Sequence, residues 1–179
     1  GDTIAKQFTL KALEKGKHVV TANKALLAGH GNELVKTARK NQVDLAFEAS
    51  CGGCMPIIKS LRESLVANSI LSMSAILNGT CNYILTKISQ DGSSFEDALK
   101  DAQALGFAEA EPSLDVDGHD TAHKLAILNS LAHGMEINLK DIHVEGIRKI
   151  TPVDIEFARS FGYTIKLLAI GKLHGDHVE

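Results

Sequence analysis

The chain has 179 residues, enough for one sizeable core or for one domain with part of another, but too few for two complete domains. Its net charge of -3 and its aromatic content of 4%, with no Trp, give no basis for binding or stacking on nucleic acid, so a small-molecule ligand is expected. No apolar run approaches the roughly 20 residues of a membrane span, and the N-terminal stretch has the pattern of an amphipathic helix rather than a secretion signal, which predicts a cytoplasmic protein.

The predicted elements alternate between helix and strand through the first half of the chain. Apolar residues recur at helical spacing in some segments and alternate in others, and Gly, Asn and Pro mark the boundaries. Asn23 is expected to cap the helix that carries Lys24, with Gly29 and Gly31 before the next helix. In chain order the pattern predicts helix 3–14, strand 18–20, the helix with Lys24, helix 33–40, strand 43–49, helix 56–68 and strand 70–77.

The second half of the chain adds helices on either side of a polar loop. The predicted order is helix 81–89, a helix opened by a capping box at Ser93–Glu96 and ended by Gly106, the polar loop, a buried helix to Gly134, strand 142–145, a helix opened by Thr151-Pro152, and strand 163–173. This order predicts an α/β protein, of the two-layer α+β type, with a mixed β-sheet covered by helices.

The densest group of charged side chains lies in this polar loop and at the start of the helix after it. Asp120 and Lys124 are four residues apart and share a helix face. The group suits a solvated helix start, where carboxylates interact well with the helix dipole. The alternative is a site in which crowded carboxylates bind an ammonium group and a lysine polarises a carbonyl, which spacing alone does not establish. The members are Glu109, Glu111, Asp115, Asp117, Asp120 and Lys124.

The motif Cys51-Gly52-Gly53-Cys54 has three interpretations. It could form a redox pair, supply half of a zinc site, or make a sharp structural turn in which the thiols act as small apolar groups. No second C-x-x-C or nearby C-x-x-H completes a zinc ligand set, and three cysteines without secretory features argue against a disulfide framework. Reduced thiols are therefore expected.

Two strand-to-helix corners could meet an anionic group. At Asn78-Gly79-Thr80 a backbone N–H and a hydroxyl could serve this purpose, or the segment could be a simple capped turn. Lys24 follows Thr21-Ala22-Asn23 at the kind of corner where open α/β sheets bind ligands. The sequence contains no G-x-G-x-x-G, so a complete dinucleotide-binding fold is not predicted.

Five segments, taken together and in order, resemble the homoserine dehydrogenases. The resemblance covers essentially the whole chain and implies NADPH- or NADH-dependent reduction of L-aspartate 4-semialdehyde to L-homoserine, on the route to threonine, methionine and isoleucine. It also implies that residues 1–24 are the remnant of a nicotinamide-binding Rossmann domain, and residues 25–179 a substrate-binding and catalytic domain of a longer enzyme. The segments are VTANKALLA, FEASCGGCMPII, ILNGTCNYIL, LGFAEAEPSLDVDGHDTAHKLAIL and GYTIKLLAIG.

The resemblance further implies roles for individual residues. Lys124 is the expected proton donor, Asp120 is expected to take part in proton transfer, and Lys24 to contact both cofactor and substrate. Gly106 is expected to face the cofactor. The expected substrate-binding residues are Glu109, Asp115, Asp120, Gly79 and Thr80.

A monovalent cation, sodium, is implied for the loop after strand 43–49. Its expected ligands are Glu48 and the backbone carbonyls of Cys51, Gly53 and Met55. The resemblance also implies a homodimer. Two other functions stay open: a binding or assembly module without activity of its own, and a thiol-redox or zinc protein based on the two cysteines of CGGC.

Overall fold

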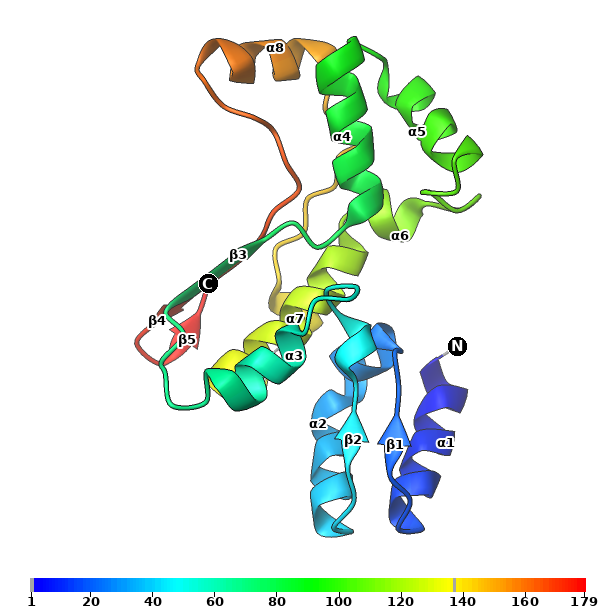
Figure 1. Ribbon diagram of the computed structural model, residues 1–179, viewed down its shortest axis with the longest axis vertical. Helices are drawn as coiled ribbons and strands as arrows, with labels where there is room; N and C mark the ends of the chain where they lie inside the picture. The colour runs from blue at the N-terminus through cyan, green and yellow to red at the C-terminus, as the bar shows by residue number, and fades with distance from the viewer. Residues whose placement is uncertain (1, 137) are drawn as a thin grey trace. The chain divides into compact units, whose positions relative to one another are not determined.

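The computed structural model describes residues 2–136 and 138–179 (Figure 1). In chain order its elements are α1 (Asp2–Glu14), β1 (Val19–Val20), α2 (Lys24–Lys40), β2 (Leu45–Ala46), the 3-10 turn η1 (Glu48–Ser50), α3 (Ile57–Lys59), the π-helical turn η2 (Ser60–Ser64), β3 (Ser72–Ala75), α4 (Gly79–Asp91), α5 (Phe95–Ala104), α6 (Ser113–Val116), α7 (His119–His133), the 3-10 turn η3 (Leu139–Asp141), α8 (Pro152–Ser160), β4 (Ala169–His174) and β5 (His177–Val178).

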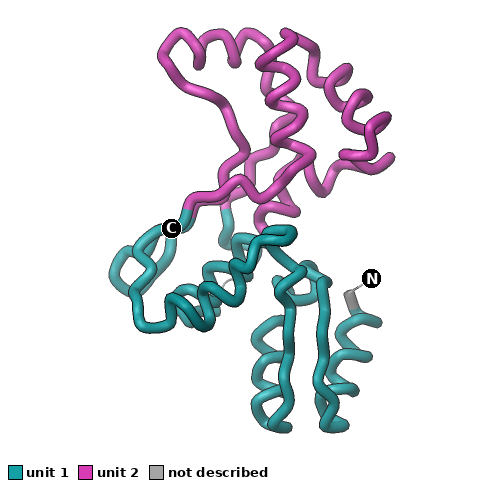
Figure 2. Tube along the Cα trace, viewed as in Figure 1, with its two compact units in different colours: residues 1–73, 123–142, 171–179 teal, residues 74–122, 143–170 magenta. Residues whose placement is uncertain are grey.

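The chain divides into two compact units (Figure 2). Unit 1 comprises residues 1–73, 123–142 and 171–179, and unit 2 comprises residues 74–122 and 143–170. The boundary falls inside β3, β4 and α7, so these three elements contribute residues to both units.

Unit 1 contains a parallel strand pair with helices packed on it. Val19 of β1 pairs with Leu45 of β2, and α1 and α2 pack on each other and on the strands. Asn23 caps α2, because its Oδ1 accepts a hydrogen bond of 3.0 Å from the N–H of Leu26. Leu13 and Leu34, from the two helices, are both fully buried. The cap follows the pattern expected from the sequence.

The prediction of a second helix after Gly29 and Gly31 is wrong, because α2 runs through both glycines without interruption. A glycine inside a helix costs about 1 kcal/mol relative to alanine. The buried residues Leu27, Leu34 and Ala38 lie seven and four positions apart, on one face of the helix. Burial of this face outweighs the cost of the glycines.

Unit 2 is built around α4, which contacts α5, α6 and α8. Its core is apolar and includes two small side chains that allow close approach of helices, Ala98 and Ala102. Thr151 and Asp154 form the capping box that opens α8, as the Thr151-Pro152 pattern predicts. The buried members of the core are Cys81, Ile84, Leu85, Ile88, Phe95, Ala98, Ala102, Val116, Ile147 and Ile155.

Strands β3, β4 and β5 form a second sheet in that order, and β4 and β5 make an antiparallel hairpin. The α/β class is therefore confirmed, with the parallel pair and the antiparallel hairpin in different sheets. Two predicted strands are shorter in the structure than expected. The strand predicted at 43–49 is limited to Leu45–Ala46, and the one predicted at 163–173 is observed at Ala169–His174. Among the described residues, no helix has the length and apolar character needed to cross a bilayer.

Two further local predictions are wrong. Residues 142–145 form no strand; the chain after them instead hydrogen-bonds to the end of α6, through the N–H of Ile147 and the carbonyl of Val116 at 2.8 Å. The start of α5 has a simple N-cap instead of the predicted capping box, and it lies one residue later, because Ser94 and not Ser93 accepts the backbone N–H of Asp97. Two adjacent serines offer similar capping patterns, and the observed start of α5 places Phe95 in the core.

Candidate functional site

The central polar residue of unit 2 is Asn78, the N-cap of α4. Its Oδ1 accepts a hydrogen bond of 2.8 Å from the N–H of Cys81, which satisfies one of the unpaired amides at the helix start. Its side-chain nitrogen donates to Asp115 Oδ1 at 2.7 Å and to Asp120 Oδ2 at 3.0 Å. A single buried amide therefore links the start of α4 to two carboxylates that are 37 and 42 residues further along the chain.

The two carboxylates are less exposed to solvent than a solvated charge cluster would be. Asp120, near the start of α7, has only 3% of its surface exposed, as does Asn78. Asp115, in α6, is partly buried, and its backbone carbonyl also accepts a hydrogen bond of 3.3 Å from the Cys81 thiol. The interpretation of the whole group as a solvated helix start is therefore wrong for Asp120, because a buried carboxylate requires hydrogen-bonding partners.

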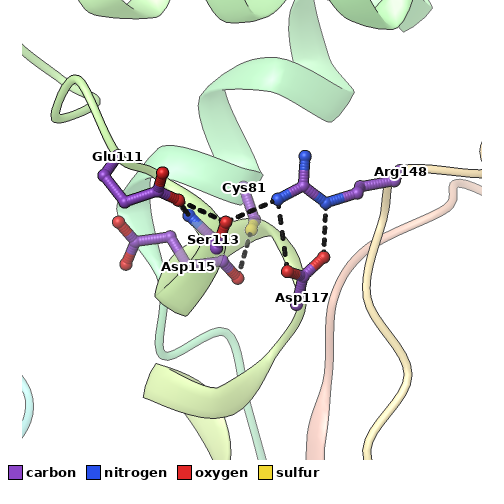
Figure 3. Close-up of polar contacts among 6 residues, drawn as sticks. All are labelled: Cys81, Glu111, Ser113, Asp115, Asp117 and Arg148. Atoms are coloured by element: carbon purple, nitrogen blue, oxygen red, sulfur yellow. Dashed lines mark hydrogen bonds and ion pairs between the residues drawn. The ribbon is translucent and has the colours of Figure 1, made fainter.

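Glu111 and Asp117 belong to a separate network on the surface (Figure 3). Arg148 donates from Nε to Asp117 Oδ1 at 2.5 Å and from its terminal nitrogen to Ser113 Oγ at 2.9 Å, and Ser113 in turn hydrogen-bonds to Glu111. The hydrogen bond from Arg148 lowers the pKa of Asp117, and those from Ser113 lower the pKa of Glu111. The predicted group of five carboxylates thus divides, with Asp115 turned away from the arginine in Figure 3.

The segments around Gly79 and Gly106, which were predicted to meet substrate and cofactor, are connected by one hydrogen bond. Thr80 Oγ1 donates to the carbonyl of Phe107 at 2.5 Å, next to Gly106, which has a φ of +78°. Gly79 is the first residue of α4 and is exposed. Glu109 is also exposed, and its backbone carbonyl accepts from the Gln103 side chain at 3.1 Å.

The two predicted lysines lie in unit 1. Lys24 is the first residue of α2, directly after its cap, and Lys124 lies in α7, half-buried. Lys124 follows Asp120 by one helical turn, as the sequence spacing predicts.

The predicted cation loop, residues 48–55, also lies in unit 1. The Glu48 carboxylate accepts hydrogen bonds from the backbone N–H groups of Ile58 at 3.0 Å and Lys59 at 2.9 Å, so it caps α3. Met55 contributes a carbonyl that accepts from the N–H of Ile57 at 2.8 Å. The chain turns back through positive φ values at Gly52, Gly53 and Cys54.

All three cysteines are free thiols. Cys51 and Cys81 are buried, whereas Cys54 is exposed. Among the described residues, no group of three or more His, Cys, Asp or Glu side chains is placed to hold a metal ion. Of the two thiols in CGGC, the buried Cys51 fits the interpretation as a small apolar side chain, whereas the exposed Cys54 does not.

A cavity of about 930 Å³ lies within unit 1, and none of the predicted site residues lines it. It is bordered by residues of α2 and α7 and by residues 134–136 and 138–140.

Sequence reasoning missed two residues that organise the site. Asn78 was recognised as part of a turn, but its contact with two carboxylates depends on packing between segments far apart in the chain. Arg148 has no motif around it, and only the fold brings it to Asp117.

Comparison with known proteins defines the class and then the family. Residues 1–48 match the family model described as the NAD-binding domain of homoserine dehydrogenase, which places the parallel β1–β2 pair and its helices among nicotinamide-binding folds. Residues 56–178 match the family model described as homoserine dehydrogenase. The chain belongs to the homoserine dehydrogenase family, which confirms the resemblance seen in the sequence.

Similar proteins support the same assignment. The chain is 49% identical over its full length to a homoserine dehydrogenase of Neisseria gonorrhoeae, and 55% identical over 94% of its length to one of Helicobacter pylori. A crystal structure of a homoserine dehydrogenase from Thiobacillus denitrificans covers 99% of the chain with a TM-score of 0.96 and 44% identity. A hyperthermophilic archaeal homoserine dehydrogenase in complex with NADPH covers 99% of it with a TM-score of 0.82 and 29% identity.

The chain spans 41% of the Neisseria protein, 40% of the Helicobacter protein, 41% of the Thiobacillus chain and 51% of the archaeal chain.

Proposed function

We propose that this chain supplies the substrate-binding region of an enzyme that interconverts L-aspartate 4-semialdehyde and L-homoserine with NADPH or NADH, in threonine, methionine and isoleucine biosynthesis. The observation that carries the proposal is the pair of carboxylates, Asp115 and Asp120, held on the buried Asn78 amide inside the segment that matches the family. Homoserine carries an ammonium group, and ionised carboxylates are the side chains that bind one.

The proposed roles follow from charge and position. Glu109 and Asp120 bind the substrate's amino end, Asp115 supports Lys124, and Gly79 and Thr80 line the pocket. The Lys124 ammonium gives a proton to the aldehyde oxygen as negative charge develops there, which stabilises the alkoxide. Lys124 is neutral once it has given this proton, and Asp120, one turn before it on α7, has a spacing suited to relaying a replacement proton to the lysine amine.

The nicotinamide cofactor supplies the hydride, and the protein supplies its orientation and the surrounding charge. The residues around Lys24 fit such a ligand, because β1 is one of a parallel pair and its carboxyl end leads through Thr21 into the capped start of α2. Gly106 suits a position facing the cofactor, since a Cβ built there meets no atom within 4 Å and the backbone is open to a ligand. Lys24 and Gly106 are therefore the proposed cofactor contacts.

A sodium ion is proposed for the loop 48–55, with Glu48 and the carbonyls of Cys51, Gly53 and Met55 as ligands. Carboxylate and carbonyl oxygens are the donors that hard cations prefer, and the three consecutive left-handed residues turn the backbone sharply between these carbonyls. The hydrogen bonds to Glu48 and Met55 each leave lone pairs on the accepting oxygens. Exchange of NaCl for choline chloride should lower the melting temperature; an unchanged melting temperature would argue against the ion.

The remaining parts of the proposal concern context. From the family resemblance we propose a homodimer and a cytoplasmic location. We also propose a division into a nicotinamide-domain remnant at residues 1–24 and a substrate domain at residues 25–179. The thiol-redox or zinc alternative is the weaker one, because Cys51 is buried and Cys54 exposed.

The test is an assay of the full-length gene product. We expect saturable, L-homoserine-dependent reduction of NADP or NAD, followed by the absorbance of the reduced nicotinamide. L-Threonine, which has the same amino-acid end but no primary alcohol, is the control substrate and should give no reduction. Absence of homoserine-dependent reduction in folded protein would reject the function.

A further inference from the structure

We propose that Asn78 is a positioning residue for the reaction, which fixes Asp115 and Asp120 in the orientation that the substrate requires. This inference rests on the proposed function, since it assigns those two carboxylates to substrate binding and support of the lysine. Asn78 itself contacts the two carboxylates and is not assigned a contact with substrate.

The orientation of the Asn78 amide is determined by its surroundings. The Cys81 backbone N–H can only donate, so the atom 2.8 Å away must be the side-chain oxygen. The nitrogen then faces Asp115 and Asp120, and it is the donor that both need. A flipped amide would set its N–H group against the Cys81 N–H and its oxygen against two carboxylates, so one arrangement is strongly preferred.

The amide also resolves an electrostatic problem. Asp115 and Asp120 each place an oxygen within 3.0 Å of the same nitrogen, which brings two like charges close together where water is scarce. The amide is a neutral donor that contributes one hydrogen to each carboxylate, so both carboxylates hydrogen-bond to the same group. No additional positive charge is introduced that would compete with the substrate's ammonium.

The start of α4 holds Asp115 at two points. Asn78 binds its side chain, and the Cys81 thiol donates to its backbone carbonyl at 3.3 Å. Asn78 and Cys81 are both buried and are joined by the capping hydrogen bond. The position of the Asp115 carboxylate is therefore fixed by residues at the start of the helix α4.

Capping alone does not explain asparagine at this position. Serine and aspartate cap helices about as well, because only an oxygen acceptor is needed. The part of Asn78 that they lack is the NH₂ group that contacts the carboxylates. Two substitutions therefore separate the roles: Asn78→Ser keeps a cap and loses the donor, and Asn78→Asp keeps the shape and places a third carboxylate beside the other two.

The experiment measures steady-state kinetics of homoserine oxidation by the full-length gene product. For Asn78→Ser we expect kcat/KM for L-homoserine to fall at least tenfold, with KM for the nicotinamide changed less than twofold. For Asn78→Asp we expect a fall of at least a hundredfold. Ser94→Ala is the matched control, since it removes the cap of α5 in the same unit, and its kcat/KM should stay within twofold of the parent.

Two results would overturn the inference. One is an Asn78→Ser enzyme with kcat/KM within twofold of the parent; the other is an equal loss in Ser94→Ala, which would reduce the role of Asn78 to helix capping. An inactive parent protein would reject the proposed function instead.

A stability measurement tests the contact without any assay of activity. In a double-mutant cycle of Asn78→Ser with Asp120→Ala, followed by urea unfolding, the two effects should be clearly non-additive. Additive effects would contradict the contact, whatever the enzymatic activity.

Discussion

Arg148 holds Asp117 through two hydrogen bonds, from Nε to Oδ1 at 2.5 Å and from the terminal nitrogen to Oδ2 at 3.2 Å. This two-point ion pair joins the segment after residue 143 to the end of α6. Asp117 therefore belongs to the surface network with Arg148, whereas Asp115 and Asp120 hydrogen-bond to Asn78.

The ion pair predicts a small, pH-dependent contribution to stability. The pKa of Asp117 is lowered in the folded protein, chiefly by the hydrogen bond from Arg148. The stabilisation is therefore present above the unfolded-state pKa, about 3.9, and is lost as the pH falls through the lower folded-state pKa. The side chains are 36% and 42% exposed, so Asp117→Asn should cost only about 0.2–1 kcal/mol at neutral pH.

Urea unfolding at several pH values measures this effect. The difference between Asp117→Asn and the parent should shrink steadily below about pH 4. Glu63→Gln is the control, because the ion pair of Glu63 with Lys59 spans 3.9 Å between well-exposed side chains. A constant difference across the whole pH range would show that Asp117 does not act through its charge.

Gly146→Ala should destabilise unit 2. A Cβ at this position would press on the carbonyl oxygen of Val116 and approach the Cα of Asp117 to 2.6 Å, and backbone atoms cannot move aside as a side chain can. The expected cost is about 1–3 kcal/mol or more. Gly29→Ala, inside α2 and with no atom within 4 Å of the new Cβ, should instead stabilise by roughly 0.5–1 kcal/mol. Thermal unfolding of both variants tests the pair, and equal effects would be inconsistent with this packing.

The cysteines should differ in reactivity. Cys54 is exposed, whereas Cys51 and Cys81 retain 2% or less of their surface. With an aromatic disulfide reagent we expect one thiol to react rapidly in the native protein and the other two only after denaturation, because access limits the reaction. Cys54→Ser should abolish the rapid phase. Two rapidly reacting thiols, or zinc in the purified protein, would revive the redox or zinc interpretation of CGGC.

Lys124→Ala should lower turnover far more than substrate binding. Loss of a general acid–base group typically costs about 10²- to 10⁴-fold in rate. In oxidation of L-homoserine the lysine accepts the proton of the alcohol, so kcat should fall by that order while KM for L-homoserine changes little. Lys100→Ala is the control, since Lys100 is 76% exposed and makes only a 3.9 Å ion pair with Asp97. Steady-state kinetics on the full-length gene product distinguish the two, and unchanged turnover in Lys124→Ala would remove the lysine from the proposed mechanism.

Local signals in the sequence correctly predicted the helix starts that are set by nearby capping residues. Asn23 caps α2 and Thr151-Pro152 opens α8 as expected, because a cap bonds to amides two or three residues away. The errors occurred where distant contacts decide. Gly29 and Gly31 remain helical because neighbouring leucines are buried, and residues 142–145 form no strand because the chain after them hydrogen-bonds to the end of α6.

The sequence by itself determined the α/β class and the family, because both depend on the order and spacing of residues along the chain. It also identified the charged residues of the candidate site as one group, but it could not show which of them contact one another. Only the tertiary structure showed that Asp115 and Asp120 hydrogen-bond to Asn78. It also showed that Asp117 forms an ion pair with Arg148. Hydrogen bonds between residues more than 30 positions apart depend on how segments pack, and no local pattern encodes that packing.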